Sequence, residues 1–242
     1  MKKTIGILGG MGPEATAYFF ELLIKKTKVE KDQDHIPVII WNNPRIPPRT
    51  DAILNRGPTP VPMLVEGVRR LRQAGADFIV IPCVTAHYYL DEVLAQEKFS
   101  FLNILVETVK WAKANLTGLK KVGLLSSTGT LKSKLFHNSF QKEGIAVIEP
   151  TSAEQQQVME AIFGKKGIKA GFTKGKPRAT IVGSAHTLIE RGAQAIIAGC
   201  TEVPLVLRKK DIPVPLLEPM SITAEAAIQK AGYELRNEKR QI

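Results

Sequence analysis

Hydrophobic positions along the chain follow two alternating patterns. Short apolar runs rich in Ile, Val and Leu, typical of buried strands, lie at 4–8, 38–41, 78–81, 99–104, 121–125, 144–149, 195–198 and 215–217. Between them, apolar residues recur every three or four positions, which predicts helices at 15–28, 61–74, 107–115, 153–163, 180–191 and 224–238. Alternating strands and helices predict an α/β protein whose parallel sheets are joined by right-handed crossovers.

The chain contains an internal repeat with an offset of 117 residues. The offset relates Cys83 to Cys200, residues 75–76 to 192–193 (Gly-Ala in both), and the apolar run 5–8 to 122–125. A repeat of this length fits two duplicated α/β halves. We expect the last helix to pack on the first half, so the predicted domains are 1–105 plus 220–242, and 106–219. A pseudo-twofold arrangement would place the active site in the cleft between them.

The two cysteines lie where this architecture places ligands. Each directly follows an apolar strand, and residues just past the carboxyl ends of parallel strands line the ligand crevice. Thr85 offers an N-cap for a helix over 86–94. Free cysteines are often small buried hydrophobes, but two of them at matching positions of a repeat favour a functional pair. No further Cys or His has metal-ligand spacing, so no metal is expected.

Two thiols facing one substrate suit proton removal and return at carbon. One thiol must be ionised and the other protonated, and matched groups on opposite faces would invert a stereocentre. Glu202, two residues past Cys200, is placed to orient a thiol or an amine. His87 and His186 are candidate helpers, although a single His near a helix start is more often a packing or capping residue.

Composition sets the broad class of the protein. The chain has 34 Lys and Arg against 23 Asp and Glu, a net charge of +11, and only 6% aromatic residues. The charge is spread along the chain without an RNA-binding or helix-turn-helix signature, so it suits solubility or attraction of a small anion, and no nucleic-acid partner is expected. No apolar run approaches the roughly 18 residues of a membrane helix, so no membrane association is expected. Two distant cysteines without a secretory signal favour free thiols in the cytoplasm.

A glycine-rich turn follows the first strand. Residues 10–15 fit the dinucleotide pattern G-x-G-x-x-A, but the second strand ends in Trp41-Asn42-Asn43 rather than in a ribose-binding acid. The proline-rich stretch 42–50 predicts an ordered loop at the same sheet edge as Cys83. Arg49 in this loop is either a ligand-binding cation or a solvated loop residue.

Four motifs carry a resemblance to a known family. They are Gly9-Gly10-Met11-Gly12-Pro13 with Ala15-Thr16, Asn42-Asn43-Pro44 with Pro48-Arg49-Thr50, Pro82-Cys83-x-Thr85-Ala86-His87, and Gly199-Cys200-Thr201-Glu202. Together they resemble the aspartate/glutamate racemase family, and the cofactor-independent aspartate racemases in particular. The resemblance covers essentially the whole chain.

The resemblance implies a two-domain homodimer that acts on an acidic amino acid with two bases and needs neither pyridoxal phosphate nor metal. It assigns the catalytic positions to Cys83 and Cys200. Thr85, Thr128 and Thr201 match positions that hold the α-carboxylate and amino group, and Arg49 and Lys169 match the cations for the side-chain carboxylate. The full expected substrate-binding set is Met11, Gly12, Asn43, Arg49, Val84, Thr85, Thr128, Lys169, Thr201 and Glu202.

Val84 departs from the family pattern, which has Asn between Cys and Thr. Loss of an amide donor to the α-carboxylate costs roughly 1.5–3 kcal/mol unless a neighbour compensates. The sequence therefore favours racemisation of aspartate, with glutamate or a broader set of amino acids as alternatives. Another carbanion reaction of the superfamily, such as decarboxylation or cis–trans isomerisation, and a non-catalytic homologue that binds acidic metabolites stay open.

Overall fold

The computed structural model describes residues 2–236 and is an α/β protein with two four-stranded parallel sheets. The chain divides into two compact units. Unit 1 holds the residues up to Ala52, Gly57–Glu107 and those from Met220 onward, and unit 2 holds Ile53–Arg56 and Thr108–Pro219. The assignment of domains to 1–105 plus 220–242, and to 106–219, stays a prediction.

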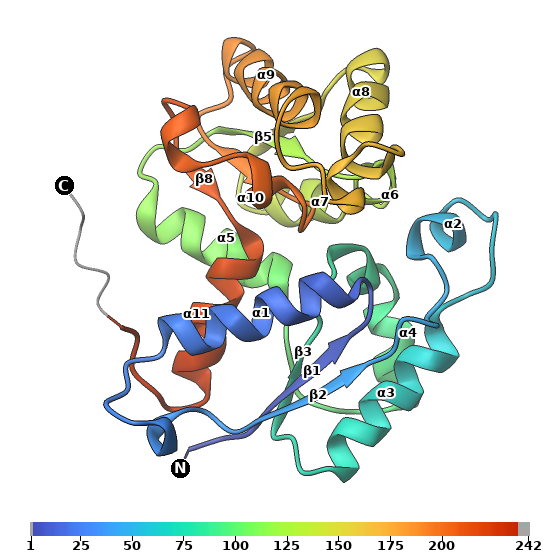
Figure 1. The fold of residues 1–242 in the computed structure, drawn as a ribbon, viewed down its shortest axis with the longest axis vertical. Coiled ribbons are helices and arrows are strands. Elements are labelled where there is room, and N and C mark those ends of the chain that lie inside the picture. Colours follow the sequence, from blue (N-terminus) through green and yellow to red (C-terminus); the bar gives the residue numbers. More distant parts are fainter. Residues whose placement is uncertain (1, 237–242) are drawn as a thin grey trace. The chain divides into compact units, whose positions relative to one another are not determined.

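Unit 1 is built on a sheet with the strand order β2-β1-β3-β4. Its strands are β1 (Ile5–Gly9), β2 (Val38–Asn42), β3 (Phe78–Val80) and β4 (Phe101–Leu102), and its helices are α1 (Pro13–Lys26), α2 (Arg49–Ile53), α3 (Val61–Gln73), α4 (Leu90–Gln96), α5 (Ile104–Asn115, which continues into unit 2) and α11 (Pro219–Lys230). The short 3-10 helices are η1 (Asp32–Asp34) and η2 (Val84–Tyr89). Helices α1 and α11 lie on one side of this sheet and α3 lies on the other (Figure 1).

Unit 2 repeats the same topology, with the strand order β6-β5-β7-β8. Its strands are β5 (Lys121–Leu125), β6 (Ala146–Ile148), β7 (Ile196–Ala198) and β8 (Leu216–Leu217), and its helices are α6 (Thr128–Lys132), α7 (Leu135–Gln141), α8 (Ser152–Phe163), α9 (Lys176–Glu190) and α10 (Val203–Val206), with 3-10 helices η3 (Ile168–Ala170) and η4 (Lys209–Asp211). Helices α8 and α9 pack side by side over a core of Leu, Ile, Val and Ala (Figure 1).

Residues related by the 117-residue repeat pair in the same register in the two sheets. In unit 1 Gly6 pairs with Ile79, and in unit 2 Gly123 pairs with Ile196 at the matching position. A Cβ on Gly6 would lie 2.9 Å from the Cβ of Ala76. A Cβ on Gly123 would lie 2.7 Å from Ile196 Cδ1 and 3.2 Å from the Cβ of Ala193. The same close approach therefore sets the first strand of each unit against the chain that enters the cysteine-bearing strand.

The helix that precedes each cysteine strand ends in the same way. Gly75 and Gly192 adopt positive φ angles of 95° and 94°. In unit 1 the amide of Ala76 bonds the carbonyl of Leu71, and the matching bond in unit 2 has the same length, 3.0 Å. These are the bonds of a Schellman ending, in which glycine adopts the left-handed conformation without steric cost.

The closing helix differs from the sequence prediction of 224–238. It begins at Pro219 and ends at Lys230. The helix stops there because Gly232 turns left-handed, with a φ of 83°. Residues 237 and 238 of the predicted range lie outside the described residues. The helix belongs to unit 1, where the amide of Lys3 bonds the carbonyl of Ala231 at 3.0 Å.

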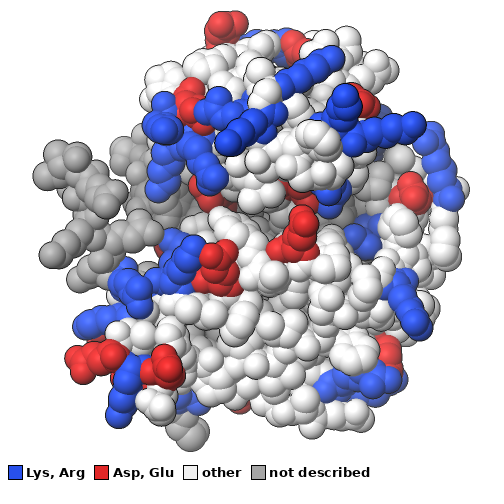
Figure 2. Space-filling view, in the orientation of Figure 1, with Lys and Arg blue, Asp and Glu red and all other residues white. Residues whose placement is uncertain are grey.

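Basic side chains are dispersed over the face of the molecule shown in Figure 2. Lys and Arg lie among uncharged surface, with Asp and Glu between some of them. Among the described residues, no helix has the length and apolar character needed to cross a membrane.

We expect Gly123→Ala to lower the free energy of unfolding by about 1–3 kcal/mol, because its methyl group would overpack the contact with Ala193 and Ile196. The matched control is Gly183→Ala in α9, where an added Cβ meets nothing within 4 Å. That change should be neutral or raise the free energy of unfolding by up to about 1 kcal/mol. Chemical denaturation of the purified variants measures both values, and equal effects would contradict the packing argument.

Candidate active site

Cys83 lies three residues beyond the carboxyl end of β3, in unit 1. Its amide bonds the carbonyl of Ile81 at 2.8 Å, and the residue is 7% exposed. Its Sγ lies 3.3 Å from the hydroxyl oxygen of Thr85. The prediction that Thr85 caps a helix over 86–94 is wrong, since Cys83 itself holds the N-cap position of η2 and α4 begins only at Leu90. The Thr85 hydroxyl faces the thiol instead.

His87 anchors the backbone of Cys83. Its Nδ1 lies 2.9 Å from the Cys83 carbonyl, and its Nε2 lies 3.4 Å from the amide of Ile104. A carbonyl only accepts and an amide only donates, so Nδ1 carries the proton and Nε2 accepts. Burial lowers the pKa of His87 to about 4. His87 is therefore a neutral, packed residue that ties the loop after β3 to the start of α5.

Arg49 fastens the proline-rich loop to the turn after β1. Arg49 is the first residue of the short helix α2, so the loop predicted for 42–50 ends at residue 48. Its guanidinium donates to the carbonyls of Ile46, Pro47 and Met11 at 3.0–3.2 Å. Its Nε is buried and has no hydrogen-bond partner among the described residues. Carbonyl oxygens satisfy donors without cancelling the positive charge, so this cation keeps its attraction for an anion.

The glycine turn that bears Met11 and Gly12 is braced from within unit 1. The amide of Gly10 bonds the Thr16 hydroxyl at 2.9 Å, and that hydroxyl also donates to the Gly12 carbonyl at 3.2 Å. A Cβ on Gly10 would lie 2.3 Å from the backbone of Asn43. The structure thus brings together Met11, Gly12, Asn43 and Arg49. Val84, the residue that departs from the family pattern, is buried.

Cys200 lies at the matching position of unit 2, after β7, and is part of a network around one carboxylate. Its thiol donates to Glu202 Oε2 at 2.8 Å, and the Thr201 hydroxyl donates to the same oxygen at 3.0 Å. The other oxygen of Glu202 pairs with Lys169 Nζ at 2.6 Å. The structure therefore gathers four of the predicted residues, from the β7 loop and from η3, into one cluster.

The contacts among Cys200, Glu202 and Lys169 shift the pKa values of the Cys200 thiol and the Glu202 carboxyl group. Burial raises the pKa of Cys200 well above its usual value, and the charge and hydrogen bond of Glu202 raise it further, against the opposing charge of Lys169. Burial alone would raise the pKa of Glu202, but Lys169 and the bonds from Cys200 and Thr201 hold it below its usual value. Near neutral pH this arrangement favours a Cys200 thiol beside an ionised Glu202.

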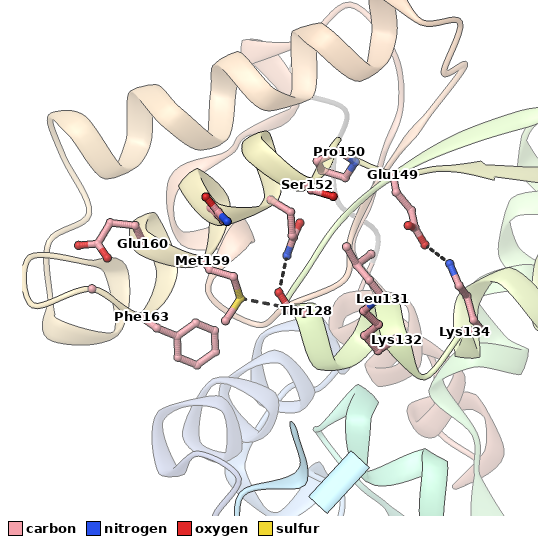
Figure 3. Close-up of a pocket in the computed structure, with 13 residues that line it drawn as sticks. Thr128, Leu131, Lys132, Lys134, Glu149, Pro150, Ser152, Met159, Glu160 and Phe163 are labelled. Atoms are coloured by element: carbon pink, nitrogen blue, oxygen red, sulfur yellow. Dashed lines mark hydrogen bonds and ion pairs between the residues drawn. The ribbon is translucent and has the colours of Figure 1, made fainter. Parts of the chain in front are cut away.

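Thr128 lies at the start of α6 in unit 2, and its side chain and amide contact α8. Its amide makes a 3.2 Å contact with Met159 Sδ, and its hydroxyl accepts from Gln155 Nε2 at 3.3 Å. It lines a pocket of about 540 Å³ (Figure 3). The lining residues are Thr128, Leu131, Lys132, Lys134, Glu149, Pro150, Ser152, Gln155, Gln156, Met159, Glu160, Phe163 and Gly164.

Sequence reasoning missed Gln155 and Met159. Both lie on one face of α8, and the helical pattern of 153–163 gave no sign that this face lines a pocket. His186, a candidate helper, is exposed and bonds the carbonyl of Asp211 at 2.9 Å. Within the described part of the chain, no three His, Cys, Asp or Glu side chains are grouped as metal ligands.

The chain is similar to known racemases over nearly its whole length. The profile of the family described as Asp/Glu/Hydantoin racemase matches residues 8–227. The structure of an aspartate racemase from Picrophilus torridus is 33% identical, covers 98% of both chains and superposes with a TM-score of 0.85. The broad specificity amino-acid racemase RacX of Bacillus subtilis is 26% identical over 93% of this chain and 96% of its own length. A glutamate racemase from Francisella tularensis, solved in complex with D-glutamate, shares the fold at 17% identity, with a TM-score of 0.68 and coverage of 95% of this chain and 81% of its own.

We expect Glu202→Gln to lower the pKa of Cys200. The change removes the negative charge that opposes thiolate formation and releases Lys169 to favour it. A Cys83→Ser background leaves Cys200 as the only thiol, so its ionisation can be followed by the pH dependence of alkylation. Glu190→Gln, on the same unit, is the control. An unchanged alkylation profile in the Glu202 variant would contradict the assignment.

We expect His87 to make folding stability depend on pH in a defined window. The unfolded chain binds a proton on this side chain near pH 6.5, whereas the folded protein does so only near pH 4. The free energy of unfolding should therefore fall by up to about 3 kcal/mol as the pH drops from 6.5 to 4. His87→Gln should lack this contribution. Denaturation curves of both proteins across that range give the difference, and parallel pH profiles would refute it.

Proposed function

The chain belongs to the Asp/Glu/hydantoin racemase family, and we propose that it racemises an acidic amino acid, aspartate first, by two-base proton transfer between Cys83 and Cys200. One observation carries the proposal. Each unit places one cysteine past the carboxyl end of its third strand, at positions related by the 117-residue repeat, beside a threonine or a glutamate that bonds the thiol. Two units of one topology thus each supply one proton carrier.

The reaction needs no net change in the enzyme's protonation. A Cys83 thiolate takes the Cα proton, so the C–H bond breaks and its electron pair stays on Cα, delocalised into the α-carboxylate. The Cys200 thiol then gives its proton to the opposite face of Cα. The product is the other enantiomer, and the two cysteines have exchanged their states, which prepares the reverse reaction.

The Glu202 network suits the donor role of Cys200. A thiol that already donates to a carboxylate is held as an acid until Cα becomes a carbanion. Lys169 Nζ lies 2.6 Å from Glu202. Its positive charge opposes the build-up of negative charge once Cys200 has lost its proton. Fixed charges and donors of this kind stabilise a transition state without reorganising during the reaction.

Arg49 supports an acidic substrate. Its positive charge meets carbonyl oxygens but no carboxylate among the described residues, so a substrate carboxylate would be its first anionic partner. The similarity to the aspartate racemase of Picrophilus torridus points in the same direction. Roles for Met11, Gly12, Asn43, Thr85, Thr128 and Thr201 in substrate binding are part of this proposal. So are the cytoplasmic location and the homodimer that the resemblance implies.

A second candidate is a racemase of broader specificity that includes glutamate. Two observations favour it: Val84 has no side-chain amide to donate, and Lys169, expected to hold a side-chain carboxylate, is already paired with Glu202. The broad specificity relative from Bacillus subtilis is consistent with this reading.

The proposal is tested by deuterium incorporation at Cα of L- and D-aspartate in D₂O, followed by NMR with the reduced protein. Exchange with inversion from both enantiomers supports two-base racemisation. Exchange with glutamate, whether together with aspartate or instead of it, supports the second candidate. Absence of exchange with every amino acid tried would instead favour a non-catalytic binding protein.

We expect Cys83→Ser and Cys200→Ser each to lower the racemisation rate by about 10²–10⁴-fold, because a serine hydroxyl is a far weaker base than a thiolate. Circular dichroism and thermal unfolding serve as controls for the fold. Racemisation by either variant at the wild-type rate would exclude a mechanism that uses both thiols.

A further inference from the structure

The pocket on unit 2 contains a polar pair whose hydrogen-bonding capacity is not fully used. Gln155 donates its Nε2 to the carbonyl of Ser126 at 3.0 Å and to the Thr128 hydroxyl at 3.3 Å. A carbonyl only accepts, so the amide nitrogen must face Ser126, which fixes the orientation of the amide. Gln155 Oε1 is then left buried, with no hydrogen-bond partner among the described residues. A buried acceptor without a donor carries a free-energy cost that a bound N–H group would relieve.

The donor beside Gln155 is also poorly satisfied. The amide of Thr128 is directed at the thioether sulfur of Met159 at 3.2 Å, and such a sulfur is a weak acceptor. Gln155 and Met159 are four residues apart on α8 and so lie on the same helix face. Figure 3 shows Thr128 with dashed contacts to the Met159 sulfur and to the neighbouring amide. Movement of the flexible Met159 side chain would release the Thr128 amide to a ligand beside Gln155.

The charges that line the pocket cancel. Lys134 pairs with Glu149 at 2.6 Å, and the other two charged lining residues, Lys132 and Glu160, are of opposite sign, so the formal charges of the lining sum to zero. The uncharged lining is part apolar, with Leu131, Pro150, Met159 and Phe163, and part polar, with Ser152 and Gln156 beside Thr128 and Gln155. The volume of about 540 Å³ suits an uncharged polar group on an aliphatic stem.

Two chains of contacts join this pocket to Cys200 within unit 2. Gln155 bonds Ser126, and a Cβ on Gly199, the residue before Cys200, would lie 3.0 Å from Ser126 Cβ. Along the second path, the Phe163 ring lies 5.4 Å from Lys169 Nζ, which pairs with Glu202. The pocket is therefore linked through Ser126 and through Lys169 to the segment that bears the proposed proton donor.

We propose that this pocket receives the side-chain carboxamide of an amino-acid substrate, glutamine first, with its N–H donating to Gln155 Oε1 and its C=O accepting from the Thr128 amide. A carboxylate has no N–H for Gln155, and an ammonium group has no acceptor for Thr128. A carboxamide supplies both. The inference rests on the proposed racemase activity and extends its substrate class.

Cα deuterium exchange with L-glutamine, L-methionine and L-aspartate tests the proposal on the unmodified protein. Glutamine should exchange with a kcat/KM about tenfold or more above that of methionine, which has a side chain of similar length without the amide. Exchange of aspartate without glutamine would overturn the carboxamide pocket alone. Absence of exchange with all three would instead overturn the proposed racemase activity.

Variants of α8 separate recognition from folding. Gln155→Leu should lower the glutamine-to-aspartate ratio of kcat/KM about tenfold, whereas Gln157→Leu, an exposed glutamine of the same helix, should leave the ratio unchanged. Met159→Ala should raise the ratio severalfold by removing the side chain that occupies the Thr128 amide. Equal losses for both substrates in Gln155→Leu, or a fall in the ratio for Met159→Ala, would refute the assignment.

Discussion

The packing of one glycine in the first strand of each unit sets the position of the cysteine that follows the third strand. Gly6 and Gly123 pair with Ile79 and Ile196 in the same register. A side chain on Gly6 would collide with Ala76 at 2.9 Å, and one on Gly123 would collide with Ile196 at 2.7 Å and press on Ala193 at 3.2 Å. This contact fixes the position of the third strand, and each cysteine follows the carboxyl end of that strand. In parallel sheets this is the edge where ligands bind.

The two thiols differ in their surroundings although the strands that precede them pair in the same register. Cys83 faces the hydroxyl of Thr85, and its loop is held by the neutral, buried His87. Cys200 donates to Glu202, whose charge is balanced by Lys169. A duplicated fold thus supplies two equivalent positions, and the residues just after them give the two thiols different hydrogen-bond partners.

Much of the fold followed from local pattern. Apolar runs and helical periodicity predicted the alternating elements, and the 117-residue offset predicted that both halves share one topology, because the side chains that pack each strand recur in the same order. Element ends were less accurate. The closing helix stops at Lys230 because Gly232 turns left-handed, and the chain after Cys83 forms a 3-10 helix in which the Thr85 hydroxyl faces the thiol.

The sequence by itself determined the fold class, the family and the residues of the proposed chemistry, because these depend on periodicity and on short motifs. The tertiary structure decided how those residues are paired. Arg49 donates to backbone carbonyls, Lys169 forms an ion pair with Glu202, and the side-chain oxygen of Gln155 has no hydrogen-bond partner among the described residues. Each of these outcomes depends on which atoms lie within about 3 Å after packing. Residues dozens of positions apart, such as Gln155 and Ser126, supply those atoms, and no local pattern records their distance.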